Sequence, residues 1–399
     1  MGFLSRTTPL SVYTVEGDIT SSDLVQFVSE GLSRLPFRSI DGSLDEISVG
    51  WVPLHDHTSP DFTNPGRFWF DGRVIVTLRT DQRKIPAPLF RYYLTAAEQE
   101  YLSLHPGLRR VSKKKRDDLK DAVRLALLAK TLPAPATVDI LWDLHHRRLH
   151  LTTLSPRVAE WVEKSFKRSF PDLRLVPMTP YHRARYLLPE PLLQCFATLN
   201  RAGTEALLDI IRSNRWLGEE FQLWLLFLTS QGESSFSVRV PGPQEEGREF
   251  SAWIDSRIVL QAPSDDGPQK VTVTGFQQTL SEPISALRRG KTIQESTLSI
   301  EMGDTWRVTL KGELFHFASL RTPPVVIDRS DLDETENEEH AAVYERISLL
   351  ETFFQLFDSL LLQFLHDRLS DDWPRIHASI SRWISSPEGE QTPLPRLTP

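Results

Sequence analysis

Residues 68–79 read Phe-Trp-Phe-Asp-Gly-Arg-Val-Ile-Val-Thr-Leu-Arg, and this stretch decides the fold of the N-terminal part of the chain. Asp71 and Gly72 form a dipeptide that is typical of a tight two-residue turn, and the arms on both sides are rich in aromatic and β-branched residues. The stretch therefore predicts an antiparallel β-hairpin. An alternating strand at residues 10–16, an amphipathic helix that starts after Asp23 and a strand at residues 47–52 precede it, which indicates a β-α-β-β unit.

Two helices are expected after this unit, at residues 88–103 and 112–130, and a second unit of similar element order follows them. It consists of a hairpin between residues 137 and 153, a helix that starts at Ser155-Pro156 and a strand at residues 173–178. We expect an α+β fold in which two β-α-β type units carry antiparallel sheets flanked by helices. Helical and mixed β C-terminal domains should complete it.

The predicted domain organisation has six segments, which differ in composition and in the period of their apolar residues. They are an N-terminal α+β domain with basic helices (1–180), a helical insertion (181–232), a mixed β domain with a short basic helix (233–328), an acidic linker (329–342), C-terminal helices (343–386) and a disordered tail (387–399).

Bulk composition indicates an ordinary globular protein, since 40% of the 399 residues are hydrophobic and 25% are charged. The single cysteine, Cys195, excludes an intramolecular disulfide and fits a reducing compartment. The start of the chain lacks the long apolar core of a signal peptide, and polar residues interrupt the most apolar run, residues 349–365. We therefore expect a cytoplasmic protein without a membrane partner.

Charge is spread unevenly along the chain, although the net charge is −7. Residues 105–168 contain 15 Lys and Arg against 7 Asp and Glu, whereas residues 328–345 contain 8 acidic residues against one Arg. The local field, rather than the total, determines which partner binds. The first of these regions is therefore a candidate for binding a polyanion.

Within that region, residues 109–124 read Arg-Arg-Val-Ser-Lys-Lys-Lys-Arg-Asp-Asp-Leu-Lys-Asp-Ala-Val-Arg and span the start of the second predicted helix. Cations in a first helical turn oppose the helix dipole by roughly 0.3–1 kcal/mol each, so helix stability alone would favour acids there. The free N–H groups of the same turn attract phosphate. A solvated helix face is the alternative interpretation. Together with two further basic clusters, the candidate phosphate contacts are Arg109, Arg110, Lys113, Lys114, Lys115, Arg116, Lys120, Lys164, Lys167, Arg168, Arg289 and Lys291.

Most aromatic residues fall on predicted buried stripes, so core packing is their expected role. Trp51 and Trp69 lie next to predicted turns. They are the aromatic side chains that we consider for stacking on bases.

Catalytic motifs are absent from the sequence: it has neither a glycine-rich phosphate loop nor a nucleophile elbow. We therefore expect no catalytic residue, cofactor or metal, and a protein that is not an enzyme. The alternative is a metal-dependent nuclease, for which the candidate ligands are Asp56, His57, Asp139 and Asp143.

A heptad-like series of apolar residues begins at Val343 and continues to Phe364. A helix buried in its own domain is one interpretation. A dimer or docking helix is the other, and its contact residues would be Ile347, Leu350, Phe354, Phe357 and Leu361. The second interpretation would also fit a protein-interaction scaffold whose acidic linker mimics nucleic acid.

Three blocks of sequence resemble the recombination-associated RdgC family in their order and spacing. They are Val49-Gly50-Trp51-Val52-Pro53, Ile85-Pro86-Ala87-Pro88 and Lys-Lys-Lys-Arg-Asp-Asp-Leu-Lys-Asp at residues 113–121. The resemblance extends over residues 1–180 and resumes near residues 281–291. Residues 181–232 are an insertion relative to the family pattern.

The resemblance implies a ring-shaped homodimer that encircles or coats double-stranded DNA without sequence preference and limits a RecA-type recombinase. By position, Gln277 and Lys291 match polar residues near the family's DNA-facing patch, whereas Phe276 stands where the family tends to have a basic residue. A ring can be acidic outside and basic within, so a net charge of −7 is compatible with DNA binding. We expect a nucleoid-associated protein whose partners are double-stranded DNA, single-stranded DNA as a further ligand, and a second copy of the chain.

Overall fold

The computed structural model describes residues 2–262, 267, 269–275, 280–326 and 338–386 of the chain. It divides into two compact units. Unit 1 comprises Met1–Thr14, His150–Ser155 and Val176–Pro399, and unit 2 comprises Val15–Leu149 and Pro156–Leu175. The sequence-based boundary at residue 180 differs from this division, because the first strand belongs with the C-terminal half of the chain.

The sheet of unit 2 has the strand order β5-β4-β2, and all of its pairs are antiparallel. Its strands are β2 (Ile47–Pro53), β4 (Arg73–Gln82) and β5 (Ala134–Asp143), and the short β3 (Trp69–Phe70) pairs with β4 after the 3-10 turn Pro65–Arg67. Asp71 and Gly72 have φ values of 47° and 78°, so both are in the left-handed region that a tight hairpin turn requires. The predicted hairpin is confirmed.

Two helices of unit 2, α1 (Leu24–Ser33) and α4 (Pro156–Ser169), pack together next to this sheet. Asp23 caps α1 as predicted, since its side chain accepts a hydrogen bond from the N–H of Gln26 at 2.9 Å. Gly31 allows close packing, because a Cβ there would lie 2.0 Å from the ring of Phe170. The indole N–H of Trp51 donates to Oγ of Ser169 at 2.7 Å inside the same core. Trp51 is thus a core residue, which corrects its interpretation as a base-stacking candidate.

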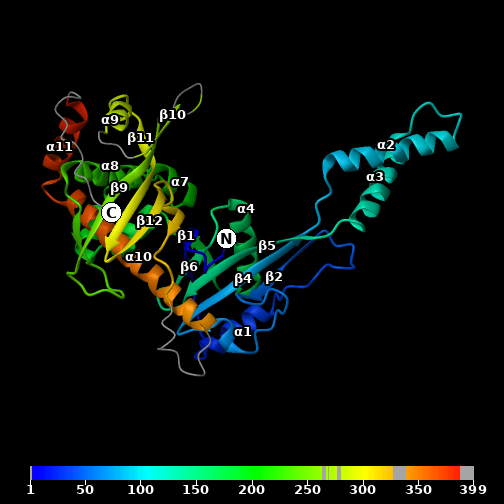
Figure 1. Ribbon diagram of the computed structural model, residues 1–399, viewed down its shortest axis with the longest axis horizontal. Coiled ribbons are helices and arrows are strands. Elements are labelled where there is room, and N and C mark those ends of the chain that lie inside the picture. Colours follow the sequence, from blue (N-terminus) through cyan, green and yellow to red (C-terminus); the bar gives the residue numbers. More distant parts are fainter. Residues whose placement is uncertain (1, 263–266, 268, 276–279, 327–337, 387–399) are drawn as a thin grey trace. The chain divides into compact units, whose positions relative to one another are not determined.

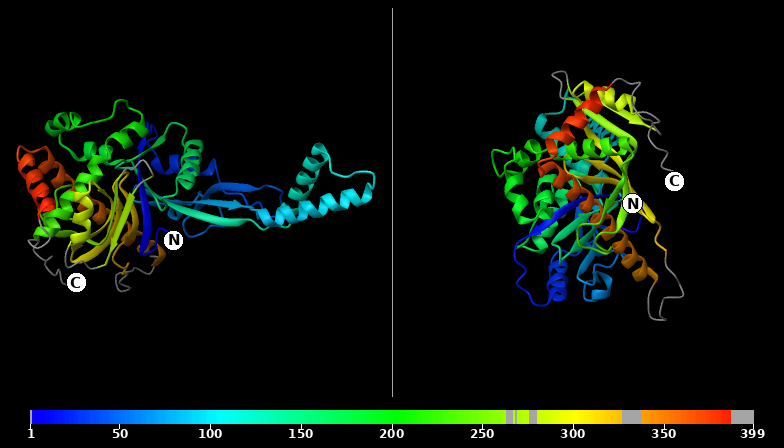
Figure 2. Two further views of the ribbon diagram at one scale, coloured as in Figure 1. Left: turned by 90° about the horizontal axis from the view of Figure 1, so that it is seen from above. Right: turned by 90° about the vertical axis from the view of Figure 1, so that its left-hand side faces the viewer.

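A helical arm, residues 87–128, lies between β4 and β5 (Figures 1 and 2). It consists of α2 (Ala87–Leu104) and α3 (Lys113–Leu128), which run side by side beyond the strand ends at Gln82 and Ala134. In the arm only Leu94, Leu127 and Leu128 are buried. On α3 the buried residues are thus the last two of the helix, while Ala126 before them is exposed.

The sheet of unit 1 has the order β10-β9-β11-β12-β13-β1, and its neighbouring strands pair in an antiparallel sense. Its strands are β1 (Thr7–Glu16), β9 (Glu249–Ala262), β10 (Gln269–Thr274), β11 (Thr292–Met302), β12 (Asp304–Lys311) and β13 (His316–Arg321), with β8 (Ser235–Ser237) paired to β9 and β7 (Arg174–Pro177) paired to β1. The boundary between the units falls within β6 (Arg148–Leu151). The sequence patterns missed β13, which alternates over only six residues.

Helices cover one face of this sheet. Thr229 of α8 (Trp216–Gln231) accepts a hydrogen bond from the N–H of Ile254 in β9 at 3.2 Å, and Trp306 of β12 donates to the carbonyl of Leu349 in α10 (Glu338–Leu369) at 3.0 Å. The remaining helices of unit 1 are α5 (Pro180–Leu187), which was not predicted, α6 (Glu190–Ala197), α7 (Leu207–Ser213), α9 (Ser281–Arg288) and α11 (Trp373–Ser385).

Helix α10 is a core element of unit 1. The five side chains of the predicted dimer seam are between 0% and 6% exposed, and they are Ile347, Leu350, Phe354, Phe357 and Leu361. The interpretation as a helix buried in its own unit is therefore the one that the structure supports, and the dimer seam is corrected. The helix is long and apolar enough to cross a membrane, yet 83% of its most apolar window is buried inside the protein, as in an ordinary core helix.

Some sequence-based expectations fall outside the described residues. These are the predicted tail at residues 387–399, residues 329–337 of the acidic linker, and Phe276 and Gln277. The remainder of that linker, residues 338–342, already belongs to α10.

An ion pair is buried in the core of unit 1, between Arg183 of α5 and Asp358 of α10. Nε of Arg183 lies 2.5 Å from Oδ1 of Asp358, and the two side chains are 1% and 4% exposed. The guanidinium also lies 5.2–5.5 Å from the ring centres of Phe317, Phe354 and Phe357. A pair this dry holds α5 against α10, because either charge left alone there would be costly.

Replacement of Asp358 by leucine should destabilise unit 1 by about 3–5 kcal/mol, because it leaves the Arg183 charge buried without its partner. The double variant Arg183→Met/Asp358→Leu should recover most of that loss, since it removes both charges. Urea unfolding followed by circular dichroism measures both. A single variant as stable as the parent would show that the pair does not hold the two helices together.

Candidate nucleic-acid interface

The basic stretch predicted from the sequence forms the tip of the helical arm and the first turns of α3. Ser112 is the N-cap residue, and its hydroxyl accepts a hydrogen bond from the N–H of Lys115 at 3.4 Å. The first turn of α3 contains no acidic residue. Free backbone N–H groups and several cations are therefore gathered at one end of this helix.

Two of the predicted phosphate contacts on α3, and a further arginine of the same helix, are paired with carboxylates. Nε of Arg116 lies 2.6 Å from Oε1 of Glu98 in α2, and Nζ of Lys120 lies 2.8 Å from Oδ1 of Asp117. The further arginine, Arg124, binds Glu46 at 2.6 Å. Its hydrogen bond lowers the pKa of the Glu46 carboxyl. Exposed pairs of this kind contribute only about 0–1 kcal/mol, so a phosphate can replace the carboxylate at little cost.

The cations at the tip of the arm are free. Arg109, Arg110 and Lys114 are exposed, and they form neither a hydrogen bond nor an ion pair with any residue that the structure describes. Nζ of Lys115 lies 5.4 Å from the ring centre of Tyr101 in α2. The tip thus presents uncompensated positive charge beside the N-terminus of α3.

Helix α2 adds groups that the sequence patterns did not single out. Tyr92 and Tyr93 are 70% and 43% exposed, their rings lie 5.5 Å apart, and the exposed Arg91 precedes them. Exposed aromatic rings beside arginine are typical of surfaces that stack on bases. The sequence signal that could have identified this surface is the run Arg-Tyr-Tyr, which interrupts the apolar period of the helix.

The second predicted cluster, on α4, is largely engaged within unit 2. Nζ of Lys164 lies 2.6 Å from Oε1 of Glu160, and Lys167 donates to the carbonyl oxygens of Pro171 and Leu173. Arg168 is exposed. This cluster therefore offers less free charge than the tip of the arm.

The third predicted cluster lies after α9 in unit 1. Arg289 is exposed, whereas Lys291 is only 8% exposed, and its ammonium donates to the backbone carbonyl and the side-chain oxygen of Gln269 at 3.3 and 3.2 Å. Lys291 is thus held by Gln269 and offers less free charge than Arg289.

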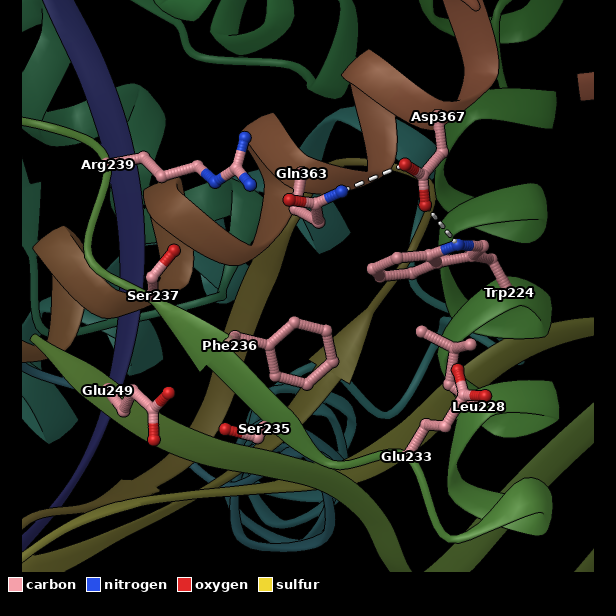
Figure 3. A pocket seen from close by; sticks show the side chains of 10 residues that line it. All are labelled: Trp224, Leu228, Glu233, Ser235, Phe236, Ser237, Arg239, Glu249, Gln363 and Asp367. Atoms are coloured by element: carbon pink, nitrogen blue, oxygen red, sulfur yellow. Dashed lines mark hydrogen bonds between the residues drawn. The ribbon is translucent and has the colours of Figure 1, made fainter. Parts of the chain in front are cut away.

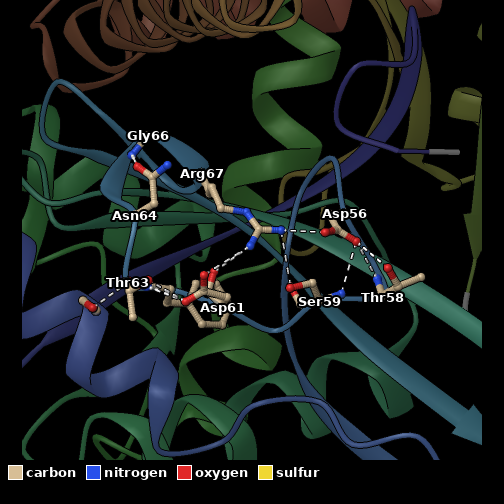
Figure 4. A network of polar contacts seen from close by, with 10 residues as sticks. Asp56, Thr58, Ser59, Asp61, Thr63, Asn64, Gly66 and Arg67 are labelled. Atoms are coloured by element: carbon tan, nitrogen blue, oxygen red, sulfur yellow. Dashed lines mark hydrogen bonds and ion pairs between the residues drawn. The ribbon is translucent and has the colours of Figure 1, made fainter.

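The candidate nuclease residues are engaged with their own neighbours. Asp56 accepts hydrogen bonds from Thr58 and Ser59 and pairs with Arg67 at 2.7 Å (Figure 4), and the Thr58 hydroxyl is the main reason that its pKa falls to about 2. Asp139 accepts from the hydroxyl of Thr77 at 2.6 Å, and Asp143 from His146. No three His, Cys, Asp or Glu side chains converge among the described residues.

A pocket of about 330 Å³ opens between α8, α10 and β8 (Figure 3). Its walls include Trp224 and Phe236, and Asp367 accepts hydrogen bonds there from Trp224 at 3.1 Å and from Gln363 at 2.8 Å. Burial raises the pKa of Asp367. The lining contains three carboxyl groups and one arginine, which disfavours a polyanion.

Residues 9–194 match a family model whose description is "Putative exonuclease, RdgC". No curated protein matches the chain. The matched segment includes all of unit 2, and it contains the whole helical arm.

Replacement of Leu94 by alanine should open the helical arm, because Leu94, Leu127 and Leu128 are its only buried residues. Loss of a buried leucine typically costs about 2–5 kcal/mol, which a two-helix arm cannot absorb. Trypsin should then cleave faster within residues 87–128, while the cleavage rate elsewhere stays unchanged. The control is Leu125→Ala, since Leu125 is 52% exposed on the same arm. Equal rates in the two variants would contradict the prediction.

Proposed function

We propose, from the match of residues 9–194 to the RdgC family model, that the protein is a non-sequence-specific DNA-binding protein of homologous recombination. In this proposal it is not an enzyme. It encircles or coats duplex DNA, and by occupying the backbone it limits the access of a RecA-type recombinase. Such a protein would be cytoplasmic and associated with the nucleoid.

The observation that carries the proposal is the free positive charge at the tip of the helical arm. Arg109, Arg110 and Lys114 have no carboxylate partner in the described part of the chain, and the N-terminal turn of α3 beside them has free N–H groups. Arginine and lysine next to such a turn bind phosphate through charge and hydrogen bonds, neither of which depends on base identity. Binding should therefore be insensitive to sequence.

The exposed tyrosines of α2 support a second mode on the same arm. Tyr92 and Tyr93 could stack on unpaired bases while the nearby cations hold the backbone. Single-stranded DNA is accordingly a further proposed ligand.

We also propose that the protein is a homodimer, and the arm offers a surface for it. Leu104 and Leu108, at the tip, are 71% and 46% exposed, which is unusual for leucine in an otherwise basic segment. A second copy of the chain, which the family resemblance implies, would cover them.

Binding to a random duplex should weaken with salt, with a log–log slope of about −0.9 for each phosphate neutralised. The variant Arg109→Gln/Arg110→Gln should reduce that slope by about 2 units, because it removes two phosphate contacts. Fluorescence anisotropy at several salt concentrations measures both. The matched control is Lys84→Gln/Lys130→Gln, which removes two exposed lysines at the base of the arm. A salt-independent affinity in the parent protein would overturn the proposal.

Exonuclease activity is the second candidate function, and the description of the matching family favours it. Such an enzyme needs carboxylates that position a metal-bound water, and Asp56, Asp139 and Asp143 each bind neighbouring side chains instead. The binding reactions, repeated with end-labelled duplex and Mg²⁺ or Mn²⁺, decide between the two. Release of nucleotides would show exonuclease activity and would overturn the proposal that the protein is not an enzyme.

The variant Leu104→Ser/Leu108→Ser should shift the protein from dimer to monomer, because it removes the apolar surface at the tip. Analytical ultracentrifugation over a concentration series measures the shift. Leu132→Ser is the control, since Leu132 is 85% exposed at the base of the arm. A dimer that survives the tip variant would place the interface elsewhere.

A further inference from the structure

The sheet of unit 1 has one face covered by helices and one face that is open. Trp306, Val308 and Leu310 of β12 are buried on the covered side, so the alternate residues Arg307, Thr309 and Lys311 point to the other side. The polar residues on that open face are distributed over six strands, and no sequence motif connects them.

A hollow of about 430 Å³ lies on this open face, and we name it the arginine cradle. Its lining includes three arginines, each from a different strand: Arg257 of β9, Arg307 of β12 and Arg321 of β13. Hydroxyl groups fill the space between them, among others those of Thr7, Thr297 and Thr309. Guanidinium groups and hydroxyls are the side chains that most often bind phosphate oxygens.

Strand register places two of these arginines directly opposite each other. Arg307 pairs with Arg321 between β12 and β13, and Arg321 pairs in turn with Thr7 of β1. Like charges in directly opposite cross-strand positions destabilise a sheet by up to about 1 kcal/mol relative to neutral pairs. The packing of the sheet gives no reason for two arginines at opposite positions. An anion bound between the two guanidinium groups would offset their repulsion.

The charge of the cradle is only partly balanced by the protein. Arg307 pairs with Asp255 at 3.2 Å, and Arg257 pairs with Glu295 at 3.5 Å. Arg321 is exposed, and its side chain has no carboxylate or hydrogen-bond partner among the residues that the structure describes. The cradle therefore keeps a net positive charge at its centre, and Arg321 is the group that an anion would neutralise first.

We propose that the arginine cradle is a second phosphate-binding surface, in which Arg307 and Arg321 hold the phosphodiester backbone of bound DNA and the threonine hydroxyls donate hydrogen bonds to the phosphate oxygens. The inference rests on the proposed DNA-binding function. It adds a contact surface in unit 1 to the one on the helical arm of unit 2. The two surfaces differ in construction, because the arm uses flexible side chains on a helix and the cradle uses arginines fixed by strand pairing.

The test measures duplex binding by anisotropy over a range of salt concentrations for Arg321→Gln and for Arg307→Gln/Arg321→Gln. We expect the log–log slope to decrease by about 1 unit for the single variant and by about 2 units for the double variant. Arg321→Gln breaks no ion pair, so circular dichroism and thermal unfolding should match the parent. Because Arg321→Gln removes one of two like charges in opposite positions, it should leave the sheet as stable as before, or more stable.

The matched control is Lys311→Gln, on the same face of β12 but outside the lining of the cradle. The Lys311 side chain is 43% exposed and the Arg307 side chain is 45% exposed, so the charges that the two substitutions remove are about equally exposed to solvent. An unchanged slope for Lys311→Gln, together with reduced slopes for the cradle variants, would support the inference. Equal reductions in all three would overturn it, because a diffuse field rather than a built site would then explain them.

The two proposals fail in different ways. If the parent protein binds no duplex, the proposed function fails, and the inference about the cradle fails with it. If the parent protein and the arm variants behave as expected while Arg321→Gln and the double variant bind like the parent, only the cradle is refuted.

Discussion

The pair of buried charges between Arg183 and Asp358 is the interaction on which the core of unit 1 depends. It joins two helices that are far apart in the sequence, and the rings of Phe317, Phe354 and Phe357 surround it. Apolar packing alone would allow α10 to shift by a turn, because leucine and phenylalanine occupy most of its buried positions. A charge that can be satisfied at only one place removes that freedom, so the pair sets register more than it adds net stability.

In contrast to the core of unit 1, the helical arm is mostly exposed. It buries only three leucines, and its remaining surface consists of charged side chains, exposed tyrosines and the apolar tip. Such a segment does little for the stability of unit 2. A protein keeps it for the surface that it presents, and the unpaired cations beside the N-terminus of α3 make that surface suited to phosphate. The cradle on the open face of the unit 1 sheet fits the same chemistry through a different architecture.

Much of the fold could be predicted because it depends on local chemistry. The Asp71-Gly72 turn, the Asp23 and Ser112 helix caps and the boundaries of α2 and α3 all follow from interactions between residues a few positions apart. The unpredicted elements are short. Helix α5 is held by Asp358, which is far away in the sequence, and β13 lies between β12 and the distant β1, so their own short sequences carry little signal.

For the candidate site, the sequence by itself determined the basic arm, because charge and helix period are both properties of neighbouring residues. It could not show that Trp51 is in the core, that Lys291 is held by Gln269, or that the heptad-like helix is buried within its own unit. For the same reason, the sequence could not show that Arg257, Arg307 and Arg321 lie together. Only pairing between distant strands brings such residues to one face, since burial and cross-strand register are set by the tertiary structure and not by spacing along the chain.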